Sequence, residues 1–229
     1  MTVQRKSLTR TIAVLFGAVT LLALSCCTKK STAQTTTTDL NLDVKDPFHF
    51  VVYGDTRFHD PTDTKAANPT ARVDLVNAIT EANPAFICIT GDIVYNGHDA
   101  DDWKVWDSET SIWRDKKIPI YPALGNHDLH GDPAVALGNY FQRFPYLKES
   151  RYYSLRVANA LLLMLDSSQT EATGRQSEWL NAKLDHVPSD VDFVFLIFHH
   201  PPYTSSSDSM AKTHGGGHSA RAPERTPTS

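Results

Sequence analysis

The sequence is poor in cysteine and lacks a hydrophobic run long enough for a stable transmembrane anchor. Three cysteines among 229 residues exclude a small domain held together by disulfides. The uncharged apolar run near the N-terminus has 14 residues, whereas a spanning helix needs about 20. The Gly-x-Ser-x-Gly motif of serine hydrolases is also missing. What is present is an ordinary globular balance, with 41% apolar and 21% charged residues, enough for one sizeable core.

Basic residues are in deficit over most of the chain. The sequence has 22 basic and 26 acidic residues, a net charge of −4. The first 30 residues contain five of the basic residues and none of the acidic ones, which leaves −9 for residues 31–229. An acidic body disfavours broad electrostatic binding of nucleic acid, so we predict no nucleic-acid partner. It leaves room for metal ions held by carboxylates.

The N-terminal segment has the pattern of an export signal. Three basic residues precede the apolar run at 11–24, and small residues follow it. Residues 22–26 resemble a bacterial lipoprotein box, in which Cys26 is lipidated after cleavage; plain secretion is the alternative. We therefore predict a signal peptide over residues 1–27, with membrane contact only through a lipid on Cys26. The expected location is exported, as a periplasmic or membrane-anchored lipoprotein or as a secreted protein.

A Thr-rich stretch follows the signal. Residues 28–45 have almost no large apolar residues before Leu40, so they have little with which to build a core. We predict a flexible tether over residues 28–45 and a folded domain over residues 46–229.

The body alternates short apolar runs with helical patterns. Strands are expected at residues 48–53, 85–90, 118–124, 151–157, 160–165 and 191–198. Helices are expected at residues 70–82, 101–116 and 174–186. The tryptophans of the helices and Cys88 of the second run are expected in the core. Strands that alternate with helices predict a layered α/β domain.

Polar residues follow these strands where each one ends. They are Asp55, Arg57, Asp92, Tyr95, Asn126, His127, Asp128 and His199. Ligands of α/β sheets bind beyond the carboxyl ends of the strands, so these side chains are expected to form one cluster. Carboxylate, amide and imidazole groups suit Mn, Fe or Zn. A carboxylate between two cations can bridge them, and two metal ions about 3.5–4 Å apart can activate a water and clamp a phosphoryl group.

Four motifs, taken in order, resemble the calcineurin-like metallophosphoesterase superfamily, and within it the purple acid phosphatase-like branch. They are Gly-Asp-Thr-Arg at 54–57, Gly-Asp-Ile-Val-Tyr at 91–95, Gly-Asn-His-Asp at 125–128 and His-His-Pro-Pro-Tyr at 199–203. The resemblance covers about residues 47–203. It implies a β-sandwich flanked by helices in four layers, αββα. It also implies hydrolysis of small phosphate esters through a hydroxide activated by two divalent or trivalent metal ions (Fe, Mn or Zn).

The resemblance also implies a role for each position. Asp55 would bind the first metal, Asp92 would bridge both, and Asn126 and His199 would bind the second. His127 would be catalytic and would meet the phosphate and the leaving group. Tyr95 falls where the branch has an iron-binding tyrosine, with simple packing as the alternative. Asp128 either orients His127 or caps the turn.

Arg57 departs from the superfamily pattern. Many members have Asp-x-His at the first motif, and that His also binds metal, whereas an arginine stays protonated and cannot. Arg57 either contacts the substrate phosphate or pairs with a nearby carboxylate. The loss of a histidine ligand favours Tyr95 as its replacement.

The C-terminal residues depart as well. The superfamily pattern finishes with Gly-His-x-His, but here only Gly217-His218-Ser219-Ala220 is found. His214 and His218 are expected in a Gly/Ser-rich loop, and the domain is expected to be truncated at its C-terminus. Two other functions therefore stay open at this point: a catalytically weak or inactive remnant, and a surface-anchored binding module.

Overall fold

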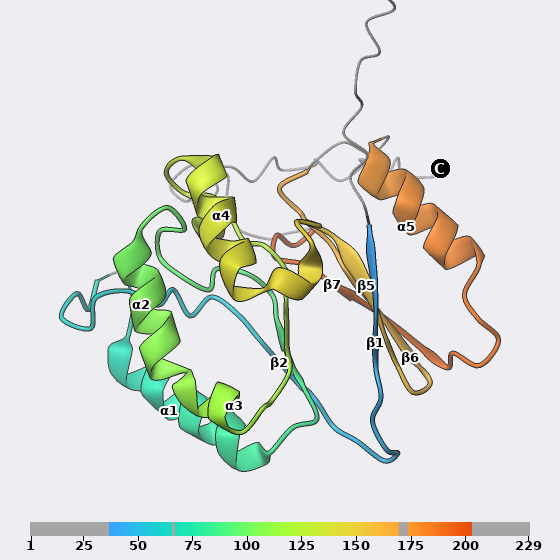
Figure 1. The fold of residues 1–229 in the computed structure, drawn as a ribbon, viewed down its shortest axis with the longest axis horizontal. Helices are drawn as coiled ribbons and strands as arrows, with labels where there is room; N and C mark the ends of the chain where they lie inside the picture. The colour runs from blue at the N-terminus through green and yellow to red at the C-terminus, as the bar shows by residue number, and fades with distance from the viewer. Residues whose placement is uncertain (1–36, 66, 170–173, 203–229) are drawn as a thin grey trace, which may run out of the picture. The chain divides into compact units, whose positions relative to one another are not determined.

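The computed structural model describes residues 37–65, 67–169 and 174–202 (Figure 1). The strands in this part of the chain are β1 (Thr38–Leu42), β2 (Val51–Tyr53), β3 (Ile87–Ile89), β4 (Ile120–Pro122), β5 (Tyr153–Val157), β6 (Ala160–Met164) and β7 (Phe193–Ile197). The α-helices are α1 (Pro69–Ala82), α2 (Ala100–Glu109), α3 (Ser111–Asp115), α4 (Pro133–Arg143) and α5 (Arg175–Asp185), with 3-10 turns at His127–Leu129 and Pro145–Leu147.

Three of the predicted strands form a parallel sheet in the order β2-β3-β4. The central strand β3 is buried along its whole length. Helices α1, α2 and α3 lie together on one side of this sheet (Figure 1). Because the three strands are parallel and adjacent, their carboxyl ends meet at one edge of the sheet, as the sequence predicts.

A second sheet has the order β1-β5-β6-β7. Strands β5 and β6 are antiparallel, and β1 and β7 run parallel to their neighbours. The prediction of a flexible tether is wrong for residues 38–42, which form β1. The reason is non-local: Leu40 and Leu42 pack against the core that β5 provides, and the Asp39 carboxylate accepts from Ser154 and Lys183.

The main core lies between the two sheets. Alternate residues of β6 (Ala160, Leu162 and Met164) belong to the same core cluster as Ile87 and Ile89 of β3. The other β6 residues are buried too, on the side of the sheet where α5 lies (Figure 1). Helices thus flank two packed sheets, which confirms the layered α/β fold class.

Two tyrosines anchor the end of β4, one to the second sheet and one to helix α4. The hydroxyls of Tyr140 in α4 and Tyr153 in β5 both donate to the carbonyl of Pro122 at the end of β4, at 2.9 Å each. All three groups are buried, so each bond satisfies a polar atom that has lost its water.

The helices differ from the predictions at two places. The helix expected over residues 101–116 is divided at Thr110, whose hydroxyl donates to the carbonyl of Trp106. Helix α4 was not predicted, although Asp132 caps its N-terminus and Pro133 begins it, both typical start signals. Trp103, Trp106 and Trp113 are buried, as predicted. The prediction is wrong for Trp179, which is only partly buried because α5 has no buried residue. None of the helices in the described residues is long and apolar enough to cross a membrane.

Strand β7 is unusually exposed within the described residues. Phe193, Val194, Phe195 and Leu196 are each at least 36% exposed, and β7 lies at the end of its sheet. The ring of Phe50, just before β2, meets that of Phe195 edge-on with centroids 5.5 Å apart. The ends of the two sheets therefore lie next to each other.

A substitution in β1 tests whether residues 38–42 belong to the folded domain. We expect Leu40→Ser to lower the free energy of unfolding by about 1–2 kcal/mol, because Leu40 packs against the core. Asn41→Ser is the matched control, because Asn41 points to solvent, and it should change stability by less than about 0.5 kcal/mol. Urea unfolding measures both; equal stabilities would mean that residues 38–42 behave as a tether.

Candidate metal centre

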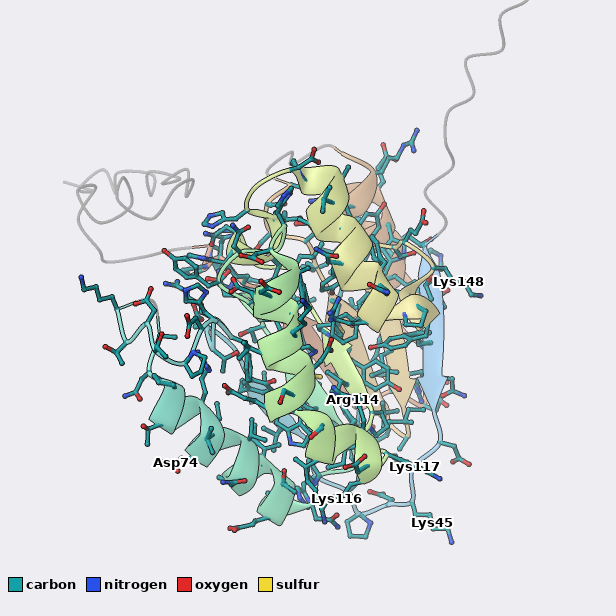
Figure 2. The ribbon with its side chains drawn as sticks, turned by 60° about the vertical axis from the view of Figure 1, so that its left-hand side comes forward. Lys45, Asp74, Arg114, Lys116, Lys117 and Lys148 are labelled. Carbon is teal, nitrogen blue, oxygen red and sulfur yellow. The ribbon has the colours of Figure 1, made fainter. Side chains whose placement is uncertain are left out.

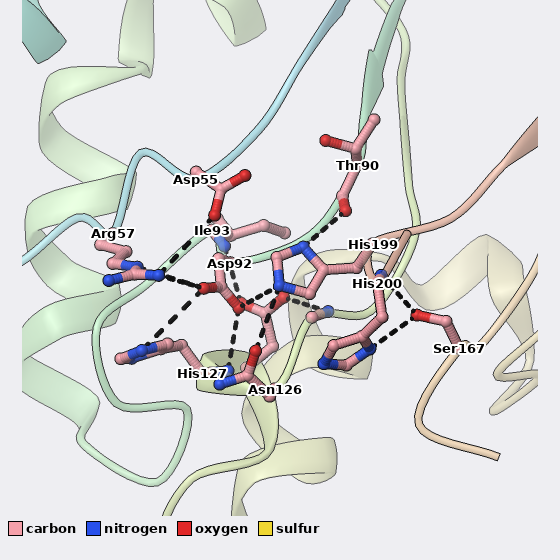
Figure 3. A network of polar contacts seen from close by, with 12 residues as sticks. Asp55, Arg57, Thr90, Asp92, Ile93, Asn126, His127, Ser167, His199 and His200 are labelled. Atoms are coloured by element: carbon pink, nitrogen blue, oxygen red, sulfur yellow. Dashed lines mark hydrogen bonds and ion pairs between the residues drawn. The ribbon is translucent and has the colours of Figure 1, made fainter. Parts of the chain in front are cut away.

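The segments after β2 and β3 run side by side. The backbone N–H of Asp55 donates to the Gly91 carbonyl at 3.1 Å, and that of Arg57 donates to the Asp92 carbonyl at 2.9 Å. Asp55, Arg57 and Asp92 all have left-handed backbones, with φ of 58°, 47° and 54°. Such conformations are uncommon for residues with a side chain and persist where surrounding contacts fix them. The arrangement directs all three side chains into one cluster (Figure 3).

Two glycines let the ends of β3 and β4 touch. Gly91 has a φ of +100°, and a Cβ there would lie 2.6 Å from the backbone nitrogen of Gly125. A Cβ on Gly125 would lie 2.3 Å from Oδ1 of Asp92. Neither position has room for a side chain, so these glycines are required for the close approach of the two loops.

Asp92 lies at the centre of the cluster and is fully buried. Its Oδ1 accepts from the backbone N–H of His127 at 2.9 Å and lies 3.3 Å from Nε2 of His199. Its Oδ2 accepts from Nε of Arg57 and lies 3.1 Å from Nη2 of the same guanidinium. Asp55 is more exposed, with its carboxylate 3.7 Å from Nη2 of Arg57.

A contact at Nδ1 orients the ring of His199. Its Nδ1 lies 3.0 Å from the Thr90 carbonyl, which can only accept, so Nδ1 carries the hydrogen. Nε2 lies 3.1 Å from Oδ1 of Asn126 and 3.3 Å from Oδ1 of Asp92. Imidazole nitrogen, amide oxygen and carboxylate oxygen are all metal-ligand atoms, so a cation bound among them would be stabilised by all three. The residues present fit a metal ion at this point.

Asp55 lies within reach of the same cluster. Asp55, Asp92 and His199 each offer a ligand atom, and these atoms lie within 4.8 Å of one another. The structure thus brings together four of the five predicted metal ligands: Asp55, Asp92, Asn126 and His199. Their role as ligands stays a prediction.

Tyr95, the fifth predicted ligand, packs against two histidine rings. Its ring lies beside those of His59 and His127, with centroid distances of 4.8 and 5.2 Å, and it is 37% exposed. These contacts correspond to the packing alternative, and ligation by Tyr95 stays a prediction.

His127 is buried beside the carboxylates. Its Nδ1 donates to the carbonyl of Tyr95 at 2.6 Å, and its Nε2 lies 4.0 Å from Oδ2 of Asp92. Burial lowers the pKa of His127, although the bond to the Tyr95 carbonyl and the charge of Asp92 oppose this. The hydrogen bond at Nδ1 thus fixes the ring, and Nε2 lies on the side that faces Asp92.

The neighbouring histidine is directed elsewhere. His200 contacts the hydroxyl of Ser167 through Nδ1 at 2.9 Å, and its backbone N–H donates to the same hydroxyl. Burial lowers the pKa of His200. Of the His-His pair, His199 is therefore the residue in contact with Asp92 and Asn126, as the sequence predicts.

Asp128 holds the loops of the cluster together. Its carboxylate accepts from the backbone N–H groups of Ile93, Val94 and Gly125, at 2.8, 3.3 and 2.9 Å. Burial raises the pKa of Asp128 to about 7, while the three backbone donors oppose this rise. Of the two predicted roles, bonding to the backbone of the turn is the one observed.

Arg72 supports the site from α1 and was not predicted. Its side chain is 3% exposed and pairs with Glu109 at 2.9 Å. It also donates to the carbonyls of His59, at 3.0 Å, and Arg57, at 3.5 Å. No local motif marks Arg72, because its partners are up to 37 residues away in the sequence.

Comparison with known families agrees with this geometry. The family model of the calcineurin-like phosphoesterases matches residues 48–223. The chain belongs to this family. A search of curated proteins found no match to this chain.

Two solved structures resemble this calcineurin-like phosphoesterase. The purple acid phosphatase PPD1 from yellow lupin (Lupinus luteus) seeds has a TM-score of 0.52 at 14% identity, over 72% of this chain and 32% of that one. The chain thus spans about a third of that phosphatase, and the likeness concerns the fold. A dimetal phosphatase from Danio rerio has a TM-score of 0.34 at 15% identity, over 60% of this chain and 52% of that one.

The backbone role of Asp128 can be tested. In Asp128→Asn, one of the two oxygens becomes an NH₂ group, which faces a backbone N–H and leaves a buried donor unpaired. We expect a loss of about 1–3 kcal/mol in the free energy of unfolding. Asp132→Asn is the control, because Asn caps a helix about as well as Asp. If both variants unfold at the same urea concentration, Asp128 does not hold the loops.

Proposed function

We propose that this calcineurin-like phosphoesterase is a metal-dependent hydrolase of small phosphate esters. The observation that carries the proposal is the convergence of three atoms of metal-ligand type, Oδ1 of Asp92, Oδ1 of Asn126 and Nε2 of His199. Membership of a phosphoesterase family supports the reaction class. A bound metal ion would supply an acidified water and would neutralise charge on the phosphoryl oxygens.

The chain's own residues would position the ester. Asp92, Asn126 and His199 would hold the metal, and the Thr90 carbonyl fixes the ring of His199 through Nδ1. The guanidinium of Arg57 lies at the more exposed side of the cluster, between Asp55 and Asp92. Positive charge next to buried carboxylates favours the approach of an anionic phosphate over a neutral ester.

His127 is suited to the leaving group. Because Nδ1 donates to the Tyr95 carbonyl, a second proton on the ring sits at Nε2, and the protonated ring would pass it to the departing oxygen and become neutral. The buried ring keeps Nε2 in one orientation, and the proton would return to the imidazole from water in the next cycle.

Several predictions from the sequence stay open. The signal peptide over residues 1–27, the lipid on Cys26 and the C-terminal His214 and His218 lie outside the described residues. We propose export to the periplasm or cell surface on the N-terminal pattern alone. A dinuclear mechanism also stays a prediction, and the remnant and binding-module alternatives would show no metal-dependent turnover.

The central carboxylate provides the first test of the function. Asp92→Asn keeps the size of the side chain but removes its charge, so we expect both the bound metal and the hydrolysis of p-nitrophenyl phosphate to be lost, the latter by at least about 100-fold. Asp74→Asn, on the exposed side of α1 (Figure 2), should leave both unchanged. Unchanged turnover in Asp92→Asn would contradict metal-dependent catalysis.

The role of His127 predicts a dependence on the leaving group. His127→Gln should reduce kcat by about 100-fold or more for an alkyl phosphate, whose leaving oxygen needs a proton, and far less for p-nitrophenyl phosphate. His186→Gln, at the exposed end of α5, is the control. Equal losses for the two substrates would indicate that His127 serves binding and not proton transfer.

A further inference from the structure

Asp92 divides the cluster into two sides. Its Oδ1 faces the backbone N–H of His127 and the ring of His199, which also contacts Asn126. Its Oδ2 faces Arg57, with Nε2 of His127 at 4.0 Å. Figure 3 shows Arg57 and His199 on opposite sides of this carboxylate. The side of His199 presents converging metal-ligand atoms, and the side of Arg57 presents a cation that is already in place.

The side of Arg57 does not fit a metal ion. Among the described residues, the acidic groups there are Asp55 and Oδ2 of Asp92, and both contact the guanidinium, at 3.7 and 3.1 Å. A guanidinium stays protonated and offers no lone pair. A metal ion bound about 2.0–2.2 Å from both carboxylates would meet this positive charge at close range, where repulsion is strong.

Arg57 is also held in position by its backbone. Its N–H donates to the Asp92 carbonyl, and its own carbonyl accepts from the buried Arg72. The Nε of Arg57 donates to Oδ2 of Asp92. Both the backbone and the guanidinium of Arg57 are therefore hydrogen-bonded to Asp92, the residue that would bridge two metal ions.

We propose that this chain binds one tightly held metal ion, through Oδ1 of Asp92, Asn126 and His199, and that the guanidinium of Arg57 takes the place of the second. The inference rests on the proposed function and replaces the two-ion expectation from the sequence. With one divalent ion, the site keeps two positive centres around a single buried carboxylate.

The first experiment counts the metal. The purified full chain is saturated with Mn²⁺, passed through a desalting column and measured by plasma mass spectrometry. We expect one equivalent, with any second Mn²⁺ bound at least about 100-fold more weakly. Electron paramagnetic resonance should show the six-line signal of an isolated Mn²⁺ and not the spectrum of a spin-coupled pair.

The second experiment removes the fixed charge. In Arg57→His, the guanidinium is replaced by an imidazole that can ligate, so we expect a second tightly bound Mn²⁺ and a spin-coupled spectrum. Arg57→Lys keeps the positive charge and should retain one equivalent. Lys116→His, at an exposed site (Figure 2), adds a histidine away from the cluster and should also retain one.

Each outcome decides between the proposals. Two equivalents in the wild-type chain would overturn the role of Arg57 while leaving metal-dependent hydrolysis intact. No bound metal in the wild-type chain would overturn the metal centre and the proposed function together. One equivalent in both the wild-type chain and a folded Arg57→His would show that Arg57 does not limit the count. If Arg57→His fails to fold, the wild-type count and spectrum still decide.

Discussion

A fully buried carboxylate organises the site and the loops around it. Asp92 is fully buried at the end of β3, and a buried charge is tolerated only where partners compensate for the lost hydration. The partners come from three other segments: Arg57 after β2, the backbone of His127 after β4 and His199 after β7. Folding therefore has to bring these segments together before the charge of Asp92 is balanced.

The support for this carboxylate is mostly backbone and mostly distant in sequence. Glycines at 91 and 125 remove the side chains that would keep the β3 and β4 loops apart. Asp128 bonds to the backbone of both loops, and Arg72 bonds to the carbonyls of the segment after β2. These contacts hold the left-handed residues in conformations that they seldom adopt, so the site is formed by the loops as a unit.

Packing between the two sheets completes the site. Asp55, Asp92 and Asn126 follow adjacent strands of one sheet, whereas His199 follows β7 of the other. The ring of His199 nevertheless reaches the Thr90 carbonyl at the end of β3. The bond from Tyr153 of β5 to Pro122 of β4 and the shared apolar core hold the two sheets together, and with them His199 and Asn126.

The sequence by itself determined the six main strands, the layered α/β class and the residues that gather at the strand ends. These features are local: a short apolar run closed by a polar residue predicts a buried strand that ends at a polar edge. The pattern did not predict β1, because Thr-Asp-Leu-Asn-Leu has only two apolar residues and becomes a strand beside β5. It did not predict α4 either, although the capping residues of α4 are visible in the sequence. Only the tertiary structure decided that Arg57 pairs with Asp92, that the ring of Tyr95 packs between His59 and His127, and that Nε2 of His199 lies beside side-chain oxygens of two other residues. Each of these depends on contacts between residues at least 30 positions apart in the sequence, which local patterns do not encode.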